Sequence, residues 1–99
     1  MILDFHPAAV VELEQAADWY QAYRSELMRE FVDEVHSAFQ KILEHPRAWQ
    51  SLGSSIRQFR LHRFPYAVVY DVSGEQILVL AIAHLHRKPG CWRERLKSE

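Results

Sequence analysis

Histidine and arginine residues gather near the C-terminal end of the chain, in the segment AIAHLHRKPGCWRER (residues 81–95). An apolar run leads into His84, and His86 and Arg87 follow after Leu85. Histidine changes charge near neutral pH, and arginine binds phosphate or carboxylate through parallel hydrogen bonds. The cluster therefore fits two kinds of chemistry: acid–base catalysis on a phosphodiester, or electrostatic binding of an anionic partner.

Metal-free RNA cleavage needs a general base, a general acid and cations that hold the phosphate. His84 or His86 fits the acid or base role. The phosphate-binding role fits Arg60, Arg63 and Arg87. The alternative for His84 is structural, because histidines at strand exits more often pack or donate a hydrogen bond than catalyse.

The residues after Pro89-Gly90 form a second group, with Trp92, Arg93 and Arg95. Two interpretations of Trp92 are open. In the favoured one, it folds back and pins the tail onto the sheet; in the other, it offers an aromatic surface to a base or a partner side chain. Arg93, Arg95 and His86 are candidates for contact with a target or partner.

Metal binding is weakly indicated. His84-x-His86 places both rings on one face of a strand, and His62 offers a third, but no carboxylate or cysteine pattern accompanies them. We expect no metal and no cofactor. Cys91 is the only cysteine, so an internal disulfide is excluded and a reducing cytoplasm is expected.

Length and composition indicate one domain over residues 1–99, with 48% hydrophobic and 25% charged residues. The net charge is −1, but residues 1–50 hold four Lys/Arg against nine Asp/Glu, and residues 51–99 hold eight against four. The second half is therefore the better candidate for meeting an anion. We expect no signal peptide and no membrane span, because the N-terminus lacks a basic region and no apolar run is long enough.

Helical periodicity follows a short apolar strand at residues 1–5. Pro7 suits a first helical position, and a stripe of apolar residues continues from Ala9 to Tyr23 at steps of three and four. Ser25 is expected to cap a second helix that begins at Glu26 and stops at His45-Pro46. The short break between the two helices predicts an antiparallel hairpin.

Alternating patterns follow a loop expected at residues 45–55. Three strands are expected, in IRQFRLHRF, YAVVYDV and QILVLAIAH, with the last one central and covered on both faces. A turn at Ser73-Gly74 would place Val72 opposite Glu75, Tyr70 opposite Ile77, Val68 opposite Val79 and Tyr66 opposite Ala81. The predicted fold is α+β, in the order β-α-α-β-β-β, with the helical hairpin packed on a small antiparallel sheet.

This register brings the turn at residues 61–65 and the exit at residues 84–87 to the same end of the sheet. Tyr70 lies away from that end and is expected in the core or in cross-strand packing. Trp19 and Trp49 are expected to pack. The acidic residues of the helices are expected to form a solvated surface.

The order of elements, the segment RFPYAVVY (residues 63–70) and the tail pattern His84-x-x-Arg87-x-Pro89-x-x-Trp92-x-x-Arg95 resemble the RelE/ParE superfamily of toxins. The tail is similar to the ParE-like, plasmid-stabilisation branch. Cys91 departs from the pattern, because family members often have an aromatic residue there.

The resemblance implies a cytoplasmic toxin of a type II toxin–antitoxin system, bound in a hetero-oligomer by an antitoxin encoded alongside it. ParE-like toxins bind and stall DNA gyrase, and this is the preferred target here. RelE-like toxins enter the ribosome and cut mRNA, and only in that case would His84, Arg87, Arg60 and Arg63 be catalytic. A degenerate toxin that acts only as an antitoxin partner is the remaining alternative.

Overall fold

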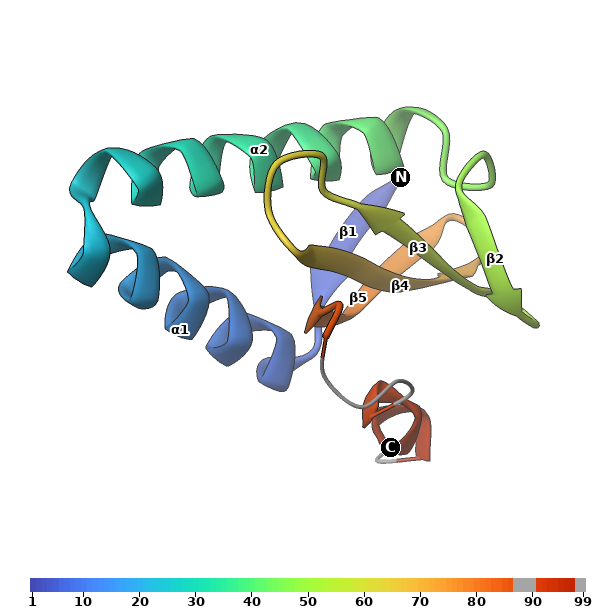
Figure 1. Ribbon diagram of the computed structural model, residues 1–99. Coiled ribbons are helices and arrows are strands. Elements are labelled where there is room, and N and C mark those ends of the chain that lie inside the picture. The colour runs from blue at the N-terminus through green and yellow to red at the C-terminus, as the bar shows by residue number, and fades with distance from the viewer. Residues whose placement is uncertain (87–90, 98–99) are drawn as a thin grey trace.

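The computed structural model describes residues 1–86 and 91–97 and shows two helices packed on a five-stranded sheet (Figure 1). The elements in chain order are β1 (Ile2–Phe5), α1 (Pro7–Tyr23), α2 (Ser25–Glu44), β2 (Gln50–Gly53), β3 (Ile56–Arg60), β4 (Tyr66–Ser73), β5 (Gln76–His84) and the 3₁₀ helix η1 (Cys91–Lys97). The predicted α+β fold is confirmed, with β2 as an additional strand. Within the described ranges, no helix has the length and apolar character needed to cross a bilayer.

The two helices form the predicted hairpin and diverge from Arg24 like the arms of a V (Figure 1). Pro7 begins α1, and the Nδ1 atom of His6 accepts a hydrogen bond from the Ala8 amide at 3.1 Å. Ser25 is the first residue of α2 instead of its cap, and Arg24 occupies the cap position without a side-chain hydrogen bond. That expectation was wrong because a single residue joins the helices and leaves Ser25 no extended position.

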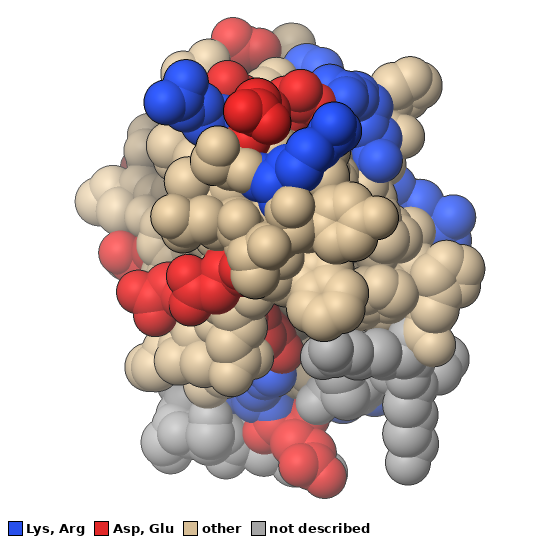
Figure 2. All heavy atoms as spheres, turned by 60° about the vertical axis from the view of Figure 1, so that its left-hand side comes forward, with Lys and Arg blue, Asp and Glu red and all other residues tan. Residues whose placement is uncertain are grey.

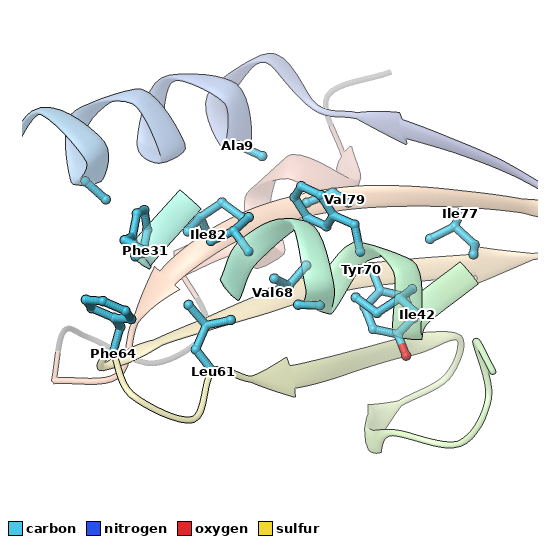
Figure 3. Packing of buried hydrophobic residues seen from close by; sticks show 14 of the residues in the cluster. Ala9, Phe31, Ile42, Leu61, Phe64, Val68, Tyr70, Ile77, Val79 and Ile82 are labelled. Carbon is cyan, nitrogen blue, oxygen red and sulfur yellow. The ribbon is translucent and has the colours of Figure 1, made fainter. Parts of the chain in front are cut away.

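The main core lies between the helical hairpin and one face of the sheet (Figure 3). Phe31, Val35 and Ile42 of α2 are fully buried there. They pack in one cluster with β4 residues such as Val68 and Tyr70 and with β5 residues. The apolar face predicted for the second helix is therefore the wall of the core.

The strand order is β1-β5-β4-β3-β2, so the apolar β5 is an inner strand, as predicted. The expectation of an antiparallel sheet is corrected at one edge, because β1 pairs parallel to β5. A parallel pair needs a long connection, and here nearly the whole chain lies between the two strands. The other edge strand, β2, was predicted as a loop because Gln50 and Ser51 hide any apolar alternation.

The β4–β5 turn lies one residue later than predicted. Ser73 still belongs to β4 and pairs with Gln76, so the loop is Gly74-Glu75 and Val72 faces Ile77. Gly74 has φ 61° at the first loop position, which is the position where a type II′ hairpin requires glycine.

A β-bulge displaces the register further, because Leu80 is an extra residue between the pairs Tyr70↔Val79 and Val69↔Ala81. As a result Tyr66 faces His84, not Ala81 as predicted. The bulge also restarts the alternation of faces. Ile82 and His84 lie on the helical side of the sheet like Val79, while Leu80 and Ala81 belong to the cluster on the opposite face.

Candidate functional site

The predicted cationic residues meet at one end of the sheet, which we call the basic edge (Arg60, His62, Arg63, His84 and His86). The amide of Leu61 donates to Tyr66 at 2.9 Å, and the amide of Leu85 donates to Pro65 at 2.8 Å. The first bond closes the β3–β4 loop, and the second joins this loop to the exit of β5. The sequence therefore predicted the correct end of the sheet, although the residue pairs that lead to it were wrong. Arg87 lies outside the described residues.

His84 is held by neighbours on both sides. Its ring stands edge-on to Tyr66 with 4.9 Å between centroids, and its Nδ1 accepts a hydrogen bond from the His86 amide at 3.1 Å. The His86 ring lies 5.4 Å from the His84 ring and is exposed. A ring whose Nδ1 accepts a hydrogen bond carries its proton on Nε2 when neutral. These contacts fix how the rings of His84 and His86 lie relative to each other. The arrangement permits either a packing role or proton transfer.

Acidic residues of α2 hold the β3–β4 loop. The Glu34 carboxylate accepts hydrogen bonds from the amides of His62 and Arg63, the latter at 3.2 Å. The Arg63 guanidinium pairs with Glu30, although both side chains remain partly exposed. Arg63, predicted as a phosphate ligand, is therefore already matched with a carboxylate inside the protein.

Arg60 and His62 are exposed beside a shallow depression of about 470 Å³ on the α2 side of the basic edge. Glu34, Lys41 and Trp49 line the same depression. Trp49 packs edge-on against Phe59 at 4.6 Å, which confirms its expected packing role. The structure describes two of the predicted phosphate ligands, Arg63 and Arg60, and of these Arg63 is the one paired with a carboxylate. Both acidic and basic side chains surround Arg60 in the depression.

The tail is fixed to the fold through Arg95. Its guanidinium makes a two-pronged ion pair with Glu12 of α1, with N–O distances of 2.9 and 2.7 Å, and also donates to the Leu80 carbonyl at 2.7 Å. Glu12 in turn accepts from the Ile82 amide at 3.0 Å. The ion pair thus bonds the carbonyl of the bulged residue Leu80 and the amide of Ile82 beyond it, and Arg95 has a structural role in this state.

Trp92 is 5% exposed and lies on the second face of the sheet with Ile56, Val69 and Leu80. The structure supports the favoured interpretation, in which Trp92 pins the tail. Arg93 is exposed, and its guanidinium carbon lies 4.8 Å from the Trp92 ring centre. Of the predicted contact residues, Arg93 and His86 are thus the accessible ones.

A cavity of about 300 Å³ lies between α1 and the ends of β4 and β5. Its lining combines α1 with the basic edge and consists of Glu12, Gln15, Ala16, Trp19, Tyr20, Tyr66, Ile82 and His84. Burial, and to a lesser degree the neighbouring Tyr66, raise the pKa of the Tyr20 phenol. Trp19 was expected to pack, but it is 69% exposed, because it lies outside the α1 stripe that faces the sheet.

Sequence reasoning missed Glu12, Glu30 and Glu34 as the partners of the basic segments. Each lies on a helix and looks like an ordinary solvated acid in the sequence. Glu12 and Arg95 are 83 positions apart, so no pattern within a short stretch of sequence could predict their pairing. Across residues 1–86 and 91–97, no group of three or more His, Cys, Asp or Glu residues is arranged to hold a metal ion.

Comparisons with known proteins agree with this architecture. A family model described as "ParE toxin of type II toxin-antitoxin system, parDE" matches residues 3–89. No curated protein sequence matches. A solved structure described as "Chromosomal ParDE TA system from P. aeruginosa" superposes with a TM-score of 0.73 at 21% sequence identity, covering 87% of this chain and 97% of that one. At this identity the structural likeness concerns the fold.

Proposed function

Because the chain belongs to the family of ParE toxins of type II toxin–antitoxin systems, which implies an antitoxin partner, we propose that it inhibits DNA gyrase in the cytoplasm by binding and without chemistry of its own. The antitoxin, encoded alongside, forms a hetero-oligomer with it and neutralises it. No cofactor takes part.

One observation supports a binding mechanism over a nuclease: two of the arginines near the candidate site are engaged within the protein. Arg63 pairs with Glu30, and Arg95 pairs with Glu12 and the Leu80 carbonyl. Phosphoryl chemistry without a metal relies on cations aimed at the developing charge. The net charge of −1 also argues against a protein that rides on ribosomal RNA.

The second candidate is a ribosome-dependent mRNA endonuclease. The contact between the rings of His84 and His86, at the same end of the sheet as the exposed Arg60, favours it. In that case His84 and Arg87 would be essential for cleavage. A degenerate toxin that only binds its antitoxin is the third outcome, and its overproduction would leave growth unchanged.

The deciding experiment is pulse labelling after induction of this protein alone, comparing incorporation of thymidine with that of methionine. We expect DNA synthesis to fall first. His84→Ala should then retain most of the inhibition, as should the control His36→Ala, which changes an exposed histidine of α2 outside the basic edge. If translation falls first and His84→Ala alone abolishes the effect, the nuclease is the function and the gyrase proposal is wrong.

A further inference from the structure

The loop between β3 and β4 holds an anion through its backbone. The successive amides of His62 and Arg63 both donate to Oε2 of Glu34, the Arg63 amide at 3.2 Å. Glu34 belongs to α2, and Figure 1 shows the loop rising from the sheet to this helix. Neighbouring amides of a turn that point at one oxygen form an anion-binding site. In this protein the bound anion is one of its own side chains.

Open hollows with cationic side chains surround this amide pair. Arg60, His62 and Lys41 are exposed and line the depression of about 470 Å³, to which Glu34 also belongs. A second depression, of about 490 Å³, shares Glu34, Lys41 and His62 with the first and adds Arg63. Because both hollows contain Glu34, the amide pair lies where they meet, and a ligand from solvent can reach it.

Two carboxylates of α2 occupy the donors of this loop. Glu34 accepts from the amides, and Glu30, one turn earlier on the same face, pairs with the Arg63 guanidinium. Figure 2 shows acidic and basic side chains lying against one another in the upper part of the molecule, at the height of α2 in Figure 1. Glu34 is half-buried, and the side chains of Arg63 and Glu30 are 58% and 41% exposed. Carboxylates in such positions can turn into solvent, because exposed ion pairs contribute little to stability.

A phosphate group fits the vacated donors better than a carboxylate does. It is tetrahedral and offers acceptor oxygens in several directions, whereas the amides and the guanidinium of Arg63 are now satisfied by two separate carboxylates. We propose that the amides of His62 and Arg63, with the Arg63 guanidinium, form a nucleotide phosphate-binding site that Glu34 closes in the unliganded protein. This site goes beyond the proposed function, because it requires neither an antitoxin nor gyrase.

A matched pair of acids on α2 tests the proposal. Glu34→Ala opens the amide pair, and the probes are thymidine monophosphate and a short oligothymidylate, measured by calorimetry at low salt. Both should bind about tenfold more tightly than to the unsubstituted chain, because a site that is open about a tenth of the time loses that factor in affinity. Asp33→Ala is the control, since Asp33 carries the same charge and lines the depression of about 490 Å³, but the loop amides donate to Glu34. Its gain should stay below about twofold, because an exposed charge is screened.

Nuclear magnetic resonance locates the bound phosphate. On titration with thymidine monophosphate, the amide signals of His62 and Arg63 should shift most in Glu34→Ala, and adding Arg63→Ala should remove the gain in affinity. Tighter binding of the oligothymidylate than of the monophosphate would identify a nucleic-acid backbone as the ligand, and equal binding a free nucleotide; both support the site.

Thermal unfolding controls for loss of the loop structure. If Glu34→Ala unfolds early, Glu34→Gln decides, because it keeps the size of the side chain and replaces the carboxylate with a weaker acceptor; its affinity should rise in the same direction. No gain in either Glu34 variant, an equal gain in Asp33→Ala, or the largest signal shifts away from His62 and Arg63 would overturn the proposal. None of these outcomes bears on gyrase inhibition, which the pulse labelling tests separately.

Discussion

The two helices lie on the same face of the sheet, yet they bury different kinds of side chain. α2 buries Phe31, Val35 and Ile42 completely. The buried residues of α1 are Ala9 and Ala16, and its large aromatic residues Trp19 and Tyr23 point outward. α2 therefore supplies most of the helical volume of the core, and α1 supplies surface.

The acids of the two helices also hold different segments. On α2, Glu30 and Glu34 bind the β3–β4 loop, and on α1, Glu12 binds the tail through Arg95. Each helix thus fixes one of the two segments that flank the exit of β5. A hairpin that looks uniform in sequence is divided between a helix that fills the core and a helix whose largest side chains lie at the surface.

The largest contrast should come from truncating one aromatic residue on each helix. Phe31→Ala leaves a cavity against Phe64 and Tyr66 and should lower the free energy of unfolding by about 3–5 kcal/mol. Trp19→Ala removes an exposed ring and should change it by no more than about 0.5 kcal/mol. Urea unfolding measures both values, and equal losses would refute the division of roles between α1 and α2.

The next contrast concerns the tail. Arg95→Ala should lower the free energy of unfolding by about 2 kcal/mol, because it breaks charged hydrogen bonds to Glu12 and Leu80 that are partly shielded from water. Hydrogen exchange of the Ile82 amide should also accelerate. Arg93→Ala is the control, since it removes only the stacking on Trp92, worth about 0.5 kcal/mol. Unchanged exchange at Ile82 in Arg95→Ala would show that α1 does not anchor the tail.

A smaller effect is expected under the end of α2, where the Tyr70 hydroxyl donates to the Pro46 carbonyl at 2.8 Å. Tyr70→Phe should lower the free energy of unfolding by about 1 kcal/mol, because this hydrogen bond is lost. Burial raises the pKa of Tyr70 to about 12, while Arg57 opposes the shift. The folded state therefore holds this proton more tightly than the unfolded chain, so stability should fall as pH rises from about 10 to about 12. Tyr70→Phe should unfold with a shallower pH dependence in that interval, and an identical slope would contradict the assignment.

The smallest effect is expected at the ion pair of Arg63 and Glu30, whose side chains are 58% and 41% exposed. Glu30→Gln should change the free energy of unfolding by no more than about 0.5 kcal/mol. The substitution also leaves Arg63 without its carboxylate partner. It therefore tests whether the ion pair with Glu30 prevents the basic edge from binding RNA. A gain of RNA binding at low salt would support that view, and fluorescence anisotropy with a short oligonucleotide would measure it.

The helical hairpin was readable from the sequence because α2 carries a broad apolar face and the ends of the hairpin are marked by Pro7 and by His45-Pro46. Tyr23 was wrongly placed on the apolar stripe of α1, since it is 75% exposed. The β-bulge was not readable, because QILVLAIAH is apolar on both faces and shows no alternation that a bulge could interrupt. Trp19 was misassigned because its hydrophobicity was weighed above its position on the helix, which lies outside the stripe.

By itself, the sequence determined which end of the sheet collects the histidines and arginines, since strand lengths and turns dictate where each strand stops. Only the tertiary structure decided which of those cations are paired. Glu30 and Arg63 are 33 positions apart, and Glu12 and Arg95 are 83 apart. Such contacts depend on how the helices pack on the sheet. The β-bulge adds a second effect, because the extra residue Leu80 moves each later side chain of β5 to the opposite face of the sheet.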